Sequence, residues 1–166
     1  MDRLLLSRWF NPLFVLCAAL FTTLIYSNSF NAAFQFDDLP IIVENAQLRD
    51  LSNLPQILLS QRGLTMATFA LNYAISGMDT AGYHAINLAI HIINTGLVYL
   101  LLLYTLRFIN TEEASARRLG ALVALIFAAH PIQTQSVVYI VQRMESLMSL
   151  FYLLALLLLV WASKAP

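Results

Sequence analysis

The stretch Leu147–Trp161, which reads LMSLFYLLALLLLVW, decides the fold of this chain, because it carries no charge and consists almost entirely of apolar residues. A helix that crosses a bilayer needs about 20 mostly apolar residues. We therefore predict a membrane-spanning helix over about residues 147–162. The composition agrees: of 166 residues, 60% are hydrophobic and 11% are charged, whereas soluble domains carry about 25% charged residues. Such a chain has too little polar surface for a water-soluble globule.

Three further apolar stretches predict spans over about residues 10–27, 83–106 and 118–140. The last is interrupted at His130-Pro131, where proline ends or kinks a helix. The first follows a basic start but has a long apolar run and no clear small-residue cleavage site, so we interpret it as a retained anchor. The expected fold class is an all-α integral membrane protein with about four transmembrane helices, in one domain over residues 1–166.

Residues 28–82 form a long loop between the first two predicted spans. The loop contains two short apolar stretches, Leu51–Leu59 and Leu64–Ile75. Pro55 suits the first turn of a helix. We expect one or two short amphipathic helices here, which would lie in the plane of the membrane interface.

Basic residues predict the orientation, because they concentrate on the cytoplasmic side of a membrane protein. With both termini in the cytoplasm, only Arg49, Arg62 and Arg143 lie on the other side. The cytoplasmic side then carries Arg3, Arg8, Arg107, Arg117, Arg118 and Lys164. The sequence thus predicts cytoplasmic termini and a loop 28–82 on the periplasmic or luminal side.

Several classes of function find no support in the sequence. The formal net charge is zero, so no basic field predicts a nucleic-acid partner. Cys17 is the single cysteine, which excludes a disulfide framework within the chain. No glycine-rich phosphate loop or nucleophile elbow is present.

Two adjacent carboxylates, Asp37 and Asp38, follow the first predicted span. Like charges side by side repel, so one acid has a raised pKa unless a cation or hydrogen-bond donors hold both. Two interpretations remain open. The pair binds a divalent cation or takes up a proton, or it forms a solvated turn that caps a short helix.

Polar residues also lie on one face of the second predicted span. His84, Asn87, His91 and Asn94 are separated by three, four and three residues, which is helical spacing. Polar groups in a membrane helix face a neighbouring helix, a cavity or a site. We expect His84 to lie near the headgroups and near the acid pair. The two histidines are about 10 Å apart along the axis, too far for one metal ion.

A second polar group follows the interruption at His130-Pro131. Arg143 and Glu145 either pair with each other, or Arg143 binds an anionic headgroup or phosphate, which suits a forked guanidinium. His130 is predicted at the same membrane surface. The candidate binding residues are therefore Arg62, His84, His130, Arg143 and Glu145.

Five blocks of this sequence resemble the membrane part of the transmembrane-and-tetratricopeptide-repeat proteins. They are Phe36-Asp37-Asp38, Arg62–Thr65 (RGLT), Phe69–Tyr73 (FALNY), Tyr83–His91 (YHAINLAIH) and His130–Leu147 (HPIQTQSVVYIVQRMESL). That family is similar to the GT-C glycosyltransferases, which include protein O-mannosyltransferases. These enzymes use a polyprenyl-phosphate-linked sugar on the non-cytoplasmic side of the membrane.

The resemblance implies roles for individual residues. Asp37 or Asp38 would be the catalytic carboxylate, acting as general base on an acceptor hydroxyl or holding a divalent cation at the donor phosphate. Arg143, with Arg62 or His84, would contact the lipid phosphate, where charge develops as the sugar leaves. The implied partners are the bilayer and a polyprenyl-phosphate lipid.

The chain also departs from the family. GT-C enzymes have many more spans, this family carries tetratricopeptide repeats after them, and Gly63 stands where the family usually has proline. Four spans are expected to hold only the carboxylate half of such a site. The alternative expectation is a non-catalytic membrane subunit that packs against other subunits of a larger complex.

Overall fold

The computed structural model describes residues 5–163, and this part of the chain consists of helices and turns without a strand. The all-helical prediction is therefore confirmed. Arg3 and Lys164, which entered the orientation argument, lie outside the described residues, as do both chain ends.

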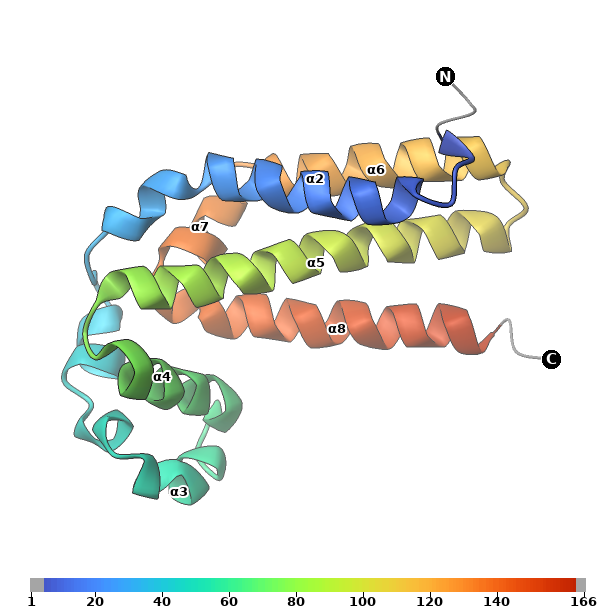
Figure 1. Cartoon of the computed structure of the whole chain (residues 1–166). Helices are drawn as coiled ribbons and strands as arrows, with labels where there is room; N and C mark the ends of the chain where they lie inside the picture. Colours follow the sequence, from blue (N-terminus) through green and yellow to red (C-terminus); the bar gives the residue numbers. More distant parts are fainter. Residues whose placement is uncertain (1–4, 164–166) are drawn as a thin grey trace.

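Four long helices lie side by side in a bundle (Figure 1). They are α2 (Phe10–Ile25), α5 (Thr80–Phe108), α6 (Glu113–Ala129) and α8 (Arg143–Ala162). Helix α5 is central and packs against α2, α6 and α8. Within residues 5–163, the segments Thr80–Phe108 and Ile140–Ala162 are long and apolar enough to cross a membrane, whereas α2 is a shorter apolar helix.

Local side-chain and backbone interactions define where the long helices begin and end. Asp79 caps α5, because its side chain accepts a hydrogen bond from the backbone N–H of Ala81 at 3.1 Å. Between α5 and α6 the chain turns at Asn110, whose φ is 59°. Arg107 and Arg117 both pair with Glu113 in the first turn of α6, where a negative charge also suits the helix dipole.

Helix α6 differs in extent from the third predicted span. It starts at Glu113 rather than residue 118 and ends at Ala129 rather than residue 140. The end follows from Pro131, which cannot continue the helix. The chain then forms the short helix α7 (Gln133–Val138) and a turn at Ile140–Gln142 before α8 begins.

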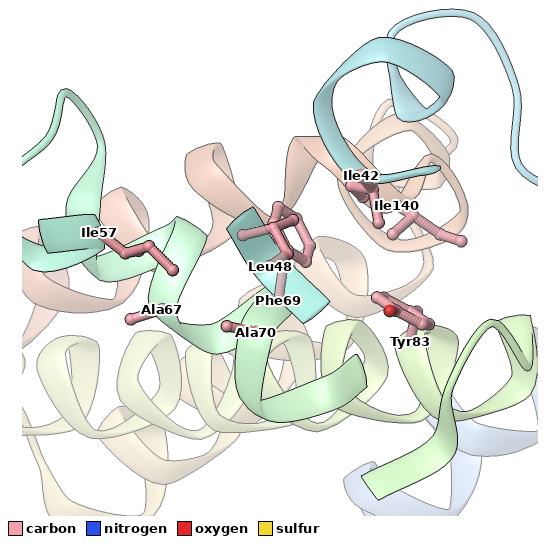
Figure 2. Close-up of a cluster of buried hydrophobic side chains, with 8 residues drawn as sticks. All are labelled: Ile42, Leu48, Ile57, Ala67, Phe69, Ala70, Tyr83 and Ile140. Atoms are coloured by element: carbon pink, nitrogen blue, oxygen red, sulfur yellow. The ribbon is translucent and has the colours of Figure 1, made fainter. Parts of the chain in front are cut away.

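The long first loop is folded and has a core of its own. It contains short helical turns, the helix α3 (Leu54–Leu58) and the helix α4 (Gly63–Ser76). Figure 2 shows the buried side chains that join them to Tyr83 and Ile140 of the bundle. This cluster comprises Ile42, Leu48, Ile57, Ala67, Phe69, Ala70, Tyr83 and Ile140. It fixes the loop against one end of the bundle.

Gly63, the first residue of α4, lies against the backbone at the end of α3. A Cβ atom at this position would be 2.3 Å from the backbone oxygen of Leu58, closer than any real contact. The N–H of Gly63 also donates to the oxygen of Ser60 at 3.1 Å, a bond that proline cannot make. This turn therefore requires glycine and excludes the proline usual in the resembling family.

Candidate functional site

The two adjacent acids have opposite environments. Asp38 is only 1% exposed, whereas Asp37 is exposed. Asp38 Oδ1 accepts the N–H of Val141 at 2.7 Å, and its Oδ2 accepts the N–H of Gln35 at 3.0 Å. Burial raises the pKa of Asp38, an effect that these two N–H donors and His84 oppose. Asp38 therefore acts as a structural tie, and the carboxylate of Asp37 remains accessible.

The backbone around Asp37 is held in an unusual shape. Phe36 has φ of 46°, in the left-handed region that bulky residues rarely adopt. The N–H of Asp37 donates to the hydroxyl oxygen of Tyr139 at 2.9 Å. Phe36 is 79% exposed, and its ring meets the ring of Tyr139 edge-on, with centroids 6.4 Å apart.

A half-open cavity of about 470 Å³ lies between this loop and α7. Its lining includes the large apolar or aromatic side chains of Phe36, Ile132, Val138 and Tyr139. The other lining residues are Ala32, Ala33, Gln35, Asp38, Pro131, Thr134 and Gln135. A second cavity of similar size adjoins it and shares Ala32, Pro131, Thr134 and Val138. Among the described residues that line either cavity, none is a lysine or arginine.

The polar side chains on one face of α5, His84, Asn87, His91 and Asn94, lie against backbone carbonyl groups near the ends of neighbouring segments. His84 Nε2 lies 3.1 Å from the oxygen of Ala32, and His91 Nε2 lies 3.2 Å from the oxygen of Ala128. Asn87 donates to the oxygen of Ile140 at 3.2 Å, and Asn94 to that of Ser146 at 3.0 Å. These four side chains thus join α5 to neighbouring segments of the bundle, in agreement with the interpretation that they serve helix packing.

His84 lies close to Asp38 without a described hydrogen bond to it. It is fully buried, and its electrostatic effect on Asp38 favours the ionised carboxylate. Its Nδ1 has no hydrogen-bond partner among the described residues. The expected proximity of His84 to the acid pair is therefore found at Asp38, while Asp37 points to solvent.

Arg143 is fully buried and binds only neutral oxygens. Its Nε donates to Asn87 Oδ1 at 2.7 Å, and its Nη2 donates to Asn72 Oδ1 at 2.8 Å and to the oxygen of Tyr83 at 3.0 Å. The guanidinium also lies 4.5 Å from the ring centre of Phe69, an attractive cation–π contact. Arg143 therefore fastens α4, α5 and the start of α8 together.

The structure gives neither of the arrangements expected for Arg143. Of the described ion pairs, none joins Arg143 to Glu145, and the guanidinium is buried rather than presented to a headgroup. Glu145 is exposed at the first turn of α8, and Arg62 is exposed before α4. Neither residue lines the cavities.

Among the exposed candidate binding residues, His130 is next in sequence to the wall of the cavities. It precedes Pro131, which lines both cavities. Its Nδ1 accepts the N–H of Ile132 at 3.2 Å, an arrangement that leaves Nε2 for a ligand.

The described side chains around Asp37 and Asp38 do not form a metal-binding site. Among residues 5–163, no three histidine, cysteine or acidic side chains gather as metal ligands. Asp38 already accepts two backbone N–H groups, so Asp37 offers the one uncommitted carboxylate of the pair. A divalent ion held by one carboxylate needs most of its ligands from water or a phosphate.

Tyr139 and Val141 are contacts of the acid pair that sequence patterns did not single out. They lie more than a hundred positions along the chain from the acids, and Val141 contributes only its backbone N–H. Their one sequence signal is their place in the motif block after His130.

The chain is similar to several protein O-mannosyl-transferases. It is 32% identical over 157 residues to protein O-mannosyl-transferase Tmtc1 of Drosophila melanogaster, a match that covers 85% of this chain and 17% of that protein. It is 31% identical to human TMTC3 over 150 residues, with 81% of this chain and 15% of the relative covered. Human TMTC4 is 30% identical over 156 residues, 80% of this chain and 21% of that protein.

These homologues are TMTC protein O-mannosyl-transferases. The resemblance to the transmembrane-and-tetratricopeptide-repeat proteins that the sequence predicted is therefore confirmed. The chain spans about a sixth to a fifth of their length. No family model and no solved structure matches it.

Proposed function

From its homology to the TMTC protein O-mannosyl-transferases, we propose that this chain is the membrane module that carries the catalytic carboxylate of a GT-C-like glycosyltransferase. The donor would be a sugar linked to a polyprenyl phosphate. The observation that carries the proposal is the exposed carboxylate of Asp37, which stands in the chain between Phe36 and the buried Asp38, two residues that line a cavity of about 470 Å³.

In this proposal Asp37 is the general base. The acceptor hydroxyl oxygen forms a bond to the anomeric carbon of the sugar, and its proton passes to the carboxylate of Asp37. The bond from that carbon to the phosphate oxygen breaks, and the polyprenyl phosphate leaves with the electron pair. General-base catalysis requires Asp37 within about 3 Å of the acceptor hydroxyl.

The leaving phosphate needs a cation or hydrogen-bond donors to stabilise its growing charge. Arg143 is committed to neutral partners inside the bundle. We assign the phosphate contact within this chain to His130, because it is exposed and directly precedes Pro131, which lines both cavities. A divalent ion at Asp37 would supply the same charge stabilisation, but no step here depends on it.

The bundle supports a four-span arrangement. Helices α2 and α6 have 16 and 17 residues, about 25 Å at 1.5 Å per residue, and lie alongside the two longer helices. The start of α2 and the end of α8 lie at one end of the bundle, and the long loop and α7 lie at the other (Figure 1). We propose that the first end is cytoplasmic and the Asp37 end periplasmic or luminal.

The test is sugar transfer from a polyprenyl-phosphate mannose to an acceptor peptide, measured with the complete gene product that carries these residues. We expect Asp37→Asn to lower the rate of transfer about 10²–10⁴-fold and His130→Ala to raise the KM for the donor. Transfer by Asp37→Asn at the wild-type rate would contradict the proposal.

A non-catalytic membrane subunit is the second candidate. The observation in its favour is that Arg62, Arg143 and Glu145 do not gather at the cavity. Purification in mild detergent separates the two functions. Stoichiometric recovery with a larger complex, together with unchanged activity of that complex for Asp37→Asn, would favour the subunit.

A further inference from the structure

We propose that Tyr139 is a positioning residue that fixes the backbone of Asp37 and so the placement of its carboxylate. The inference rests on the proposed function of Asp37 and adds a residue that acts through it. Tyr139 contacts the backbone of Asp37 and not its carboxylate, so its role is to orient the base.

The first support is the direct contact. The hydroxyl oxygen of Tyr139 accepts the N–H of Asp37 at 2.9 Å, which is a good hydrogen-bond length. The same side chain packs against the ring of Phe36 at an interplanar angle of 83°. Tyr139 therefore holds the residue before the base and the backbone of the base itself.

The second support is the strained backbone at Phe36. A large side chain at φ of 46° is an outlier, and such residues persist only where the surroundings impose the conformation. Phe36 is mostly exposed, so general burial does not impose it. Instead, the contacts of Tyr139 and the two hydrogen bonds to the Asp38 carboxylate impose this conformation on Phe36. Together they also hold Asp37, which lies between Phe36 and Asp38.

The third support is the firm attachment of Tyr139. It precedes the turn Ile140–Gln142, whose Val141 N–H binds Asp38. Ile140 is fully buried, and its oxygen accepts a hydrogen bond from Asn87. Arg143, the first residue of α8, follows directly, and its side chain is bonded to α4 and α5. The segment Tyr139–Val141 is thus a rigid support for both acids.

The experiment compares Tyr139→Phe with Tyr152→Phe in the complete gene product. Phenylalanine keeps the ring and removes the acceptor of the Asp37 N–H. Tyr152 is 65% exposed on α8 and controls for the loss of a hydroxyl. We expect Tyr139→Phe to lower kcat about tenfold, the effect of one hydrogen bond, with the KM for the donor unchanged. Hydrogen exchange at the Asp37 amide should accelerate, and Tyr152→Phe should match the wild type in both measurements.

Three results would overturn the assignment. They are an unchanged kcat for Tyr139→Phe, an unchanged exchange rate at the Asp37 amide, and a raised KM at constant kcat, which would make Tyr139 a substrate contact. Asp37→Asn in the same assay separates the two claims. If it is inactive while Tyr139→Phe is normal, only the role of Tyr139 fails. If it transfers sugar normally, the proposed function fails and the role of Tyr139 fails with it.

Discussion

At the scale of single residues, the acid pair shows how two neighbours with the same side chain acquire different tasks. Asp38 is buried and bound by two backbone N–H groups, and Asp37 is exposed. The sequence indicated that the pair mattered, but it could not assign the roles. The assignment depends on Val141, whose backbone meets Asp38 only after the chain folds.

The stability of the two asparagine variants should differ. Asp38→Asn replaces one acceptor oxygen by an N–H₂ group that faces a backbone N–H, so we expect a loss of about 1–3 kcal/mol in the free energy of unfolding. Asp37→Asn should stay within about 0.5 kcal/mol of the wild type, because its side chain is exposed. Thermal unfolding in mild detergent measures both, and equal stabilities would contradict the division of roles.

Arg143 lies in a different place from the one that its residue type suggested. A cation at a predicted membrane surface suggested a phosphate ligand, but its side chain reaches Asn72 and Asn87 inside the bundle. The nearby histidine and asparagine stripe, in contrast, was predictable from its helical spacing. Such spacing defines a face of a helix, whereas the partner of a long flexible side chain depends on tertiary packing.

Removal of Arg143 should therefore impair folding more than donor binding. Arg143→Ala leaves Asn72, Asn87 and the oxygen of Tyr83 without their donor, and we expect a loss of about 3 kcal/mol or more in unfolding free energy. Arg62→Ala is the matched control, because Arg62 is exposed, and its stability should be nearly unchanged. A stable Arg143→Ala with reduced affinity for the donor would restore the phosphate role.

At the scale of elements, the connection between α3 and α4 depends on one glycine. Apolar spacing predicted two short helices in the loop, but it could not predict how closely they approach. Gly63 permits that approach, because its missing side chain leaves room for the backbone of Leu58. Ile57 of α3 and Ala67, Phe69 and Ala70 of α4 belong to the loop core shown in Figure 2.

Two glycine-to-alanine variants test the connection. Gly63→Ala places a methyl group against the backbone oxygen of Leu58 and should destabilise the protein by about 1–3 kcal/mol, as overpacking does. Gly96→Ala, in α5, meets nothing within 4 Å and should be neutral or stabilising by up to about 1 kcal/mol. Unfolding of the two variants under one condition makes the comparison, and equal effects would contradict the geometry.

At the scale of the whole molecule, the bundle brings the long loop and the break after α6 to one end. Hydropathy predicted the long helices because burial in a membrane requires long apolar runs. It could not predict the cavity between residues 32–38 and 131–139, which arises from Pro131 and from contacts across the chain.

The orientation can be measured with an impermeant maleimide on sealed membrane vesicles whose outer surface is the periplasmic or luminal side. In a Cys17→Ala background, we expect labelling of Gln61→Cys, which lies in the long loop. Glu112→Cys, between α5 and α6, should react only after the membrane is permeabilised. The reverse pattern would place Asp37 in the cytoplasm and exclude the proposed use of a donor on the other side.

The central claim, that Asp37 and not Asp38 is the base, is tested most directly by the rate of sugar transfer per folded molecule. For Asp37→Asn we predict a loss of about 10²–10⁴-fold, the usual contribution of a general base. Asp38→Asn, measured at a temperature where it remains folded, should lose less. An Asp37→Asn rate within twofold of the wild type would contradict the claim.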